Sequence, residues 1–82
     1  MHSDKTLYHF VIQTDGDVYH VFATIMSHVA ATTTIDLWCP ENQLLNKRFT
    51  ATKVDGIGDY LHGFVRSMMV ENHIVGVLKY VE

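Results

Sequence analysis

Six histidines are the first residues of this sequence whose chemistry suggests a function, because imidazole nitrogens are common metal ligands. They are spread along the chain of 82 residues as His2, His9, His20, His28, His62 and His73. No two of them have the three- or four-residue spacing that places two ligands on one face of a helix. We therefore expect solvated histidines, with no metal site and no cofactor.

Two further groups of residues could carry out catalysis. Cys39 is the only cysteine, and a cysteine nucleophile needs a nearby base and a group that lowers its pKa; the sequence shows neither beside it. Asp59 and His62 could act as an acid–base pair, but neighbours of this kind on a helix surface usually contribute only about 0.2–0.5 kcal/mol. We assign no catalytic residue, and a small enzyme that uses Asp59, His62 or Cys39 is kept as an alternative.

The segment "VDGIGDYLHG" places Gly56 and Gly58 between a strand and a helix, where phosphate-binding loops occur. Its spacing differs from the G-x-G-x-x-G pattern, and Asp55 and Asp59 would repel a phosphate. A flexible turn is the simpler interpretation. The alternative is a small-molecule-sensing domain whose neutral or cationic ligand binds near Asp55, Gly56 and Gly58.

The composition limits the class of protein. Hydrophobic residues make up 48% and charged residues 18%, which is typical of one folded domain over residues 1–82. Such a short domain buries only about 60–65% of its unfolded surface, so a partner subunit is a common source of added stability. The net charge of −3 argues against nucleic acid, and the apolar runs are far shorter than the roughly 20 residues that cross a membrane. One cysteine and no signal peptide predict a cytoplasmic protein.

Most of the chain can be assigned to strands and helices from its residue pattern. Strands are predicted at residues 6–13, 31–38, 44–54 and 74–81. In the first of these, Tyr8, Phe10 and Ile12 share the face that we expect in the core. A helix is predicted over residues 55–69, because its apolar residues fall on a single stripe and Asp55 can cap it.

The segment "IQTDGDVYHVF" is compatible with two structures. An Asp-Gly pair between β-forming residues is a hairpin signal, which would give a longer meander with one helix. As a helix, residues 18–30 instead place their apolar side chains on one stripe, with His20 and Thr24 on the opposite side. Because the helical pattern separates apolar from polar residues better, we predict a helix here and keep the hairpin as the alternative.

With that helix the element order is βαββαβ. This order predicts an α+β fold of the ferredoxin-like type, a four-stranded antiparallel sheet with two helices on one face. The first and last strands would then pair, and the helix-free face would carry an apolar strip of Leu7, His9, Val11, Val75, Val77 and Val81. Apolar patches of a few hundred Å² usually mark a contact surface, so these residues are predicted to bind a protein partner.

The function expected from these features is that of a non-enzymatic protein-interaction or regulatory module that acts through the helix-free face, as a homodimer. Small acidic domains often serve as adaptors or inhibitors, including those encoded by phages and mobile elements, which is an association with a class only. The sensor alternative predicts stabilisation by a ligand, and the enzyme alternative predicts a concave polar pocket.

Overall fold

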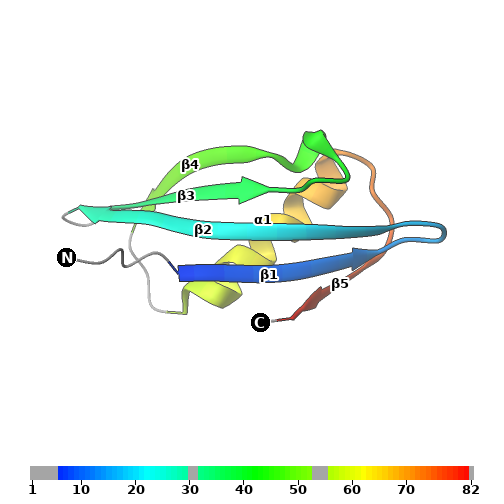
Figure 1. Ribbon diagram of the computed structural model, residues 1–82, viewed down its shortest axis with the longest axis horizontal. Coiled ribbons are helices and arrows are strands. Elements are labelled where there is room, and N and C mark those ends of the chain that lie inside the picture. The colour runs from blue at the N-terminus through cyan, green and yellow to red at the C-terminus, as the bar shows by residue number, and fades with distance from the viewer. Residues whose placement is uncertain (1–5, 30–31, 53–55, 82) are drawn as a thin grey trace.

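The computed structural model describes residues 6–29, 32–52 and 56–81 and shows a five-stranded antiparallel sheet with one α-helix across one face (Figure 1). The elements are β1 (Thr6–Gln13), β2 (Val18–Val29), β3 (Thr32–Trp38), the 3-10 turn η1 (Gln43–Leu45), β4 (Lys47–Thr52), α1 (Ile57–Glu71) and β5 (Val77–Tyr80). The sheet order β4-β3-β2-β1-β5 makes the first four strands a meander. α1 then carries the chain back behind the sheet, so that β5 pairs with β1.

The predicted helix over residues 18–30 is wrong, and so is the ferredoxin-like fold with four strands and two helices. The segment forms β2, a strand of 12 residues that pairs with β1 on one side and β3 on the other. The alternative hairpin, with a longer meander and one helix, matches the structure. The predicted pairing of the first strand with the last is confirmed, although it occurs in a different fold.

The turn of the β1–β2 hairpin is held by a threonine. The Thr14 N–H donates to the Asp17 carbonyl (2.9 Å), and the Thr14 hydroxyl oxygen accepts from the Asp17 N–H (3.0 Å). Among the described residues only Gly56 and His73 have positive φ, so the Asp-Gly pair does not form the usual type I′ turn. Local hydrogen bonding by Thr14 therefore favours chain reversal over the start of a helix.

The core lies between α1 and the face of the sheet that α1 covers. On β2, Val21, Ala23 and Ile25 are buried in alternation, which is the period of a strand. The other buried apolar residues are Phe10, Ile12, Ile35, Leu37, Cys39, Leu45, Leu61, Val65, Met68 and Met69. Because Phe10 and Ile12 are both among them, the predicted core face of β1 is confirmed.

The predicted helix over residues 55–69 is confirmed as α1, with each boundary displaced by two residues. The residue before it, Gly56, has a left-handed φ of 71°, which glycine adopts without strain. The predicted cap, Asp55, lies outside the described residues, as do His2 and the side chain of His28. None of the described helices has the length and apolarity that crossing a bilayer requires.

The connection from α1 to β5 is tight. The Asn72 side-chain amide donates to the Met68 carbonyl (2.9 Å), and His73 follows with a left-handed φ of 58°. Gly76 then passes so close to Gln13 that a Cβ atom at this position would lie 2.5 Å from the Gln13 carbonyl oxygen. This close approach sets β5 against the end of β1.

Candidate functional site

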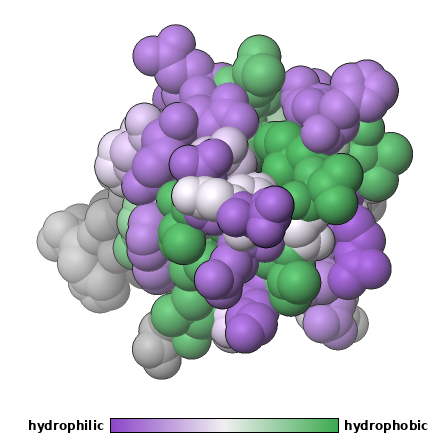
Figure 2. All heavy atoms as spheres, turned by 90° about the vertical axis from the view of Figure 1, so that its right-hand side faces the viewer, coloured by the Kyte–Doolittle hydropathy of each residue, from purple (hydrophilic) through white to green (hydrophobic). Residues whose placement is uncertain are grey.

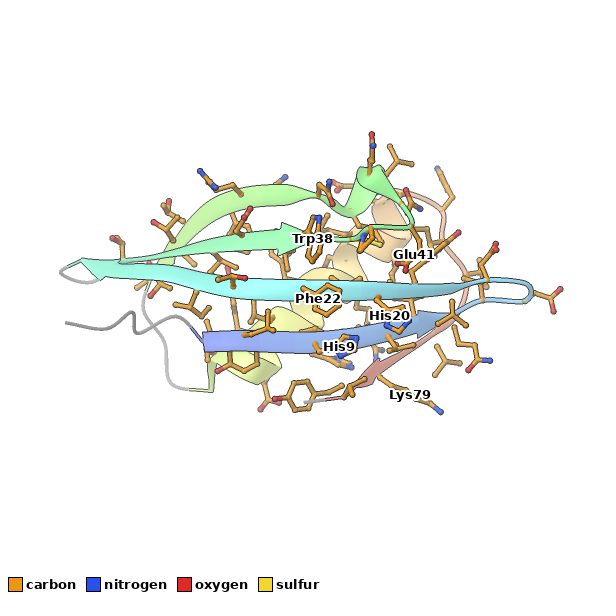
Figure 3. The ribbon with its side chains drawn as sticks, in the orientation of Figure 1. His9, His20, Phe22, Trp38, Glu41 and Lys79 are labelled. Atoms are coloured by element: carbon orange, nitrogen blue, oxygen red, sulfur yellow. The ribbon has the colours of Figure 1, made fainter. Side chains whose placement is uncertain are left out.

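The face of the sheet that α1 leaves uncovered, called here the open face, carries a cluster of rings (Figure 3). This ring cluster consists of His9 on β1, His20 and Phe22 on β2, and Trp38 at the end of β3. His9 pairs with Phe22, and Phe22 pairs with Trp38, so these three side chains form one row across three strands. Trp38 is 51% exposed, and the other three rings are half-buried.

The rings of this row stack on one another. The ring centroids of His9 and Phe22 are 4.6 Å apart with planes inclined by 18°, and those of Phe22 and Trp38 are 5.1 Å apart. The first separation is close to the strand spacing of about 4.7–4.9 Å, so His9 and Phe22 stack across neighbouring strands, whereas the planes of Phe22 and Trp38 are tilted by 35°. Single-stranded nucleic acids bind through free ring faces on which their bases stack. In the His9–Phe22 pair the two facing ring surfaces cover each other.

His9 and His20 are joined by a hydrogen bond. His9 Nε2 and His20 Nδ1 are 3.0 Å apart, so one nitrogen must donate and the other accept. The ring centroids are 5.2 Å apart. With the two nitrogens 3.0 Å apart, the centroids reach this separation only when both nitrogens lie close to the line between the rings, so the nitrogens point at each other. Two ligands of one metal ion would instead point at a common site. In the described parts of the chain, no three His, Cys, Asp or Glu side chains are grouped closely enough to hold a metal ion.

Glu41 completes the edge of the open face where β3 ends. The β3 ladder stops at Trp38, two residues before the pairing would reach His20. Glu41 Oε1 accepts a hydrogen bond from the His20 N–H at 2.8 Å and takes the place of the missing strand partner. This hydrogen bond is the main reason why the pKa of Glu41 lies below its ordinary value. The carboxylate is exposed and gives this edge a negative charge.

We expect Glu41→Gln to be less stable than the wild type at neutral pH and equal to it in acid. The pKa of Glu41 is lower in the folded chain, so its contribution is complete above the ordinary pKa of 4.5 and is lost as the pH falls through the folded value. The amide can still accept the hydrogen bond, and solvent screens the exposed charge, so the expected difference is only about 0.5 kcal/mol. Urea unfolding at neutral pH and near about pH 2 measures it. A difference independent of pH would contradict the assignment.

The open face brings together five of the six residues predicted to bind a partner. They are Leu7, His9 and Val11 on β1, Val77 on β5, and Val81 immediately after β5. The Val81 N–H donates to the His9 carbonyl (2.8 Å), which continues the β1–β5 ladder by one bond. Leu7, Val77 and Val81 are 59%, 58% and 50% exposed. These aliphatic side chains extend the ring cluster towards the β5 edge.

Val75, the sixth of these residues, lies on a different surface. It lines an open groove of 510 Å³ with Val70 and Ile74, at the end of the molecule where α1 ends, and Val77 borders this groove as well. Figure 2 looks onto this end, where the largest group of hydrophobic side chains lies at the upper right and smaller groups lie at the lower left and lower centre. Arg66 is the charged residue of the groove lining. The groove is open and has few polar groups in its lining, so it does not indicate which ligand it could bind.

Gly58 of the sensor alternative and Asp59 and His62 of the enzyme alternative meet at a small hollow near the start of α1. Gly58, Asp59 and His62 line it together with Tyr80, and its volume is 180 Å³. Ligand pockets are usually about 300–1,000 Å³, so this hollow is too small for most metabolites. Asp59 and His62 share no hydrogen bond in the described structure, and Gly56 is exposed outside the hollow. The geometry gives neither alternative a developed site.

Cys39 is buried beneath the edge that Glu41 completes. Its Sγ donates to Glu41 Oε1 (3.7 Å), and burial raises the pKa of the thiol above its ordinary value. A thiol with a raised pKa is protonated at neutral pH and is a poor nucleophile. Cys39 therefore packs as a small hydrophobic residue, as its position in the sequence suggested.

Five residues of the open face were not predicted from the sequence: His20, Phe22, Trp38, Glu41 and Lys79. The first two were assigned to a helix, and the others become neighbours only through strand pairing. The hairpin signal of the Asp-Gly pair could have found His20 and Phe22, because a turn centred there sets Val11 opposite His20 and His9 opposite Phe22.

The fold and the open face define a small α+β domain in which a four-stranded meander gains a fifth strand after one helix. A scan against protein-family models finds no match to this chain, and no curated protein or solved structure matches it. Its function is therefore inferred from its own surfaces.

Proposed function

We propose that this domain is a non-enzymatic protein-interaction module that binds through its open face, and that in the purified protein its partner is a second copy. The observation that supports this function is the exposure of apolar side chains on the open face. Leu7, Trp38 and Val81 are each at least 50% exposed there, around a ring cluster that is already stacked. Exposed apolar patches mark contact surfaces, and tryptophan is enriched among the residues that dominate binding energy.

The size of the open face is sufficient for a stable dimer. The molecule measures 42 × 23 Å in the plane of Figure 1, which looks onto this face. A standard interface buries about 800 Å² per partner, which fits within that outline. Two sheets that pack face to face lie about 10 Å apart, and their side chains interdigitate.

Other features support a binding role in the cytoplasm. The buried thiol of Cys39 is held protonated, which argues against nucleophilic catalysis. A single free cysteine is also typical of a reducing compartment. We therefore propose a cytoplasmic module that regulates or links proteins, in the manner of an adaptor or inhibitor.

We expect Val81→Asp to dissociate the dimer. Each copy would bury an unpaired carboxylate at a cost of about 1–3 kcal/mol. Because about 1.4 kcal/mol changes an equilibrium tenfold, two such sites should raise the dissociation constant by at least about 25-fold. Sedimentation equilibrium over a wide range of protein concentration measures this constant.

The matched control is Val70→Asp, the same change at a side chain that is 73% exposed on α1, behind the sheet. We expect this variant to remain as dimeric as the wild type. Far-ultraviolet circular dichroism shows whether both variants keep their fold. A wild type that is monomeric at its highest soluble concentration, or a Val70→Asp variant that dissociates equally, would overturn the proposal.

A further inference from the structure

One row of side chains on the open face is charged at both ends. Val11 on β1 pairs with Lys79 on β5 and with His20 on β2. The Glu41 carboxylate accepts a hydrogen bond from the His20 N–H, on the side of β2 that faces away from β1. Figure 3 shows Lys79 at the β5 edge, Glu41 at the opposite side of the face, and His20 between them. The row therefore has a cation at one end, an anion at the other, and Val11 and His20 between them.

The neighbouring row also has two different ends, one aliphatic and the other aromatic. It begins with Val81 beside His9 on β1 and continues through Phe22 to Trp38. An aliphatic side chain thus stands at the β5 end, and the largest aromatic side chain stands at the β3 end. Both rows are centred between β1 and β2. On one side of this centre lie β1 and β5, and on the other lie β2 and the end of β3, with β4 beyond them.

We propose that two copies pack open face to open face about a two-fold axis that runs parallel to the strands between β1 and β2. This inference rests on the proposed function and specifies its geometry. The rotation reverses each row, so Lys79 faces the partner's Glu41 and Val81 faces the partner's Trp38. Each contact occurs twice, as in any isologous interface, and the open face is complementary to itself.

The other two-fold axis available to face-to-face sheets runs perpendicular to the strands. That rotation keeps β5 on the side of the partner's β5, so both Lys79 side chains fall on one side and both Glu41 side chains on the other. Like charges then gather at each edge of the interface, which is unfavourable. The positions of Lys79 and Glu41 therefore favour the axis parallel to the strands.

Zero-length carbodiimide coupling tests this arrangement, since it joins a lysine amine to a carboxylate only when the two are in contact. Within one copy the Glu41 carboxylate lies beside β2 and Lys79 lies on β5, two strand spacings or about 9–10 Å from β2, and a linkage within one copy would not join two chains. We expect a covalent dimer in which mass spectrometry identifies a Lys79–Glu41 linkage. Lys79→Arg and Glu41→Gln are matched controls, because each should remove this linkage and leave the dimer intact.

A charge exchange provides an independent measurement. Lys79→Glu places two carboxylates together at both ends of the interface, and we expect the dissociation constant of the dimer to rise about tenfold. Glu41→Lys should have the same effect, and the double variant Lys79→Glu/Glu41→Lys should recover most of the wild-type affinity. Thermal unfolding of each variant shows whether the loss of the Glu41 hydrogen bond to His20 has altered the monomer.

The possible results test the two-fold axis and the proposed binding function independently. The linkage and the recovery in the double variant would support the two-fold axis. A dimer that Val81→Asp dissociates, but that shows neither the linkage nor any response to Lys79→Glu, would overturn the axis and leave the open face as the binding surface. A monomeric wild type would overturn both.

Discussion

Phe10→Ala is expected to lower the free energy of unfolding by about 3–5 kcal/mol. Phe10 is fully buried in β1, and its ring lies against Tyr80 of β5 and His62 of α1, with centroids 5.3 and 6.1 Å away. Its removal leaves a cavity where two strands and the helix meet. A domain of this length is stabilised by only about 4–12 kcal/mol, so a large share of its stability depends on this ring.

Urea unfolding at one fixed protein concentration measures this loss, since the proposed self-association would make the apparent stability depend on concentration. Val70→Ala serves as the comparison, because Val70 is 73% exposed on α1. We expect Val70→Ala to change stability by no more than about 0.5 kcal/mol. Equal losses in the two variants would mean that the core face of β1 has been assigned incorrectly.

Gly76→Ala is expected to lower the free energy of unfolding by about 1–3 kcal/mol and to loosen β5. A Cβ atom at this position would lie 2.5 Å from the Gln13 carbonyl oxygen and 3.1 Å from its carbonyl carbon. These are backbone atoms, so the clash can be relieved only by moving β5 away from β1. Amide hydrogen exchange at Val81 reports on this movement, because its N–H donates to the His9 carbonyl.

Gly63→Ala is the matched control for this substitution. Gly63 lies in α1, and a Cβ atom there would meet nothing within 4 Å. Alanine in a compatible helical position should raise the free energy of unfolding by about 0.4–1 kcal/mol. If both glycine variants were stabilised, the close approach of Gly76 to Gln13 would be contradicted.

The elements with one apolar face were predictable from the sequence. Alternation identified β1 and placed Phe10 and Ile12 in the core, and the apolar stripe identified α1. β2 was assigned to a helix because it carries apolar residues on both faces. Val21 and Ile25 point into the core, while Phe22 points into the ring cluster, and apolar neighbours such as Val21 and Phe22 imitate helical spacing. The apolar residues that β2 contributes to the open face are therefore the reason why this strand was assigned to a helix.

The candidate site was predictable only in part, for the same reason. Its aliphatic residues on β1 and β5 follow from alternation in two strands that were assigned correctly. Trp38 and His9 are far apart in the chain and become neighbours only through the register of three strands. The role of Glu41 depends on a backbone N–H left free where β3 ends, which no residue spacing reveals.

The order of the strands also bears on how the chain folds. Each pairing from β1 to β4 joins strands that follow one another in sequence, so short loops can close these contacts rapidly. The pairing of β1 with β5 joins the two ends of the described chain and carries the largest loss of chain entropy. We therefore expect β5 to dock last and to bring Lys79 and Val81 with it. In the proposed dimer, assembly of two copies would follow this final step, so dimer formation would indicate completed folding.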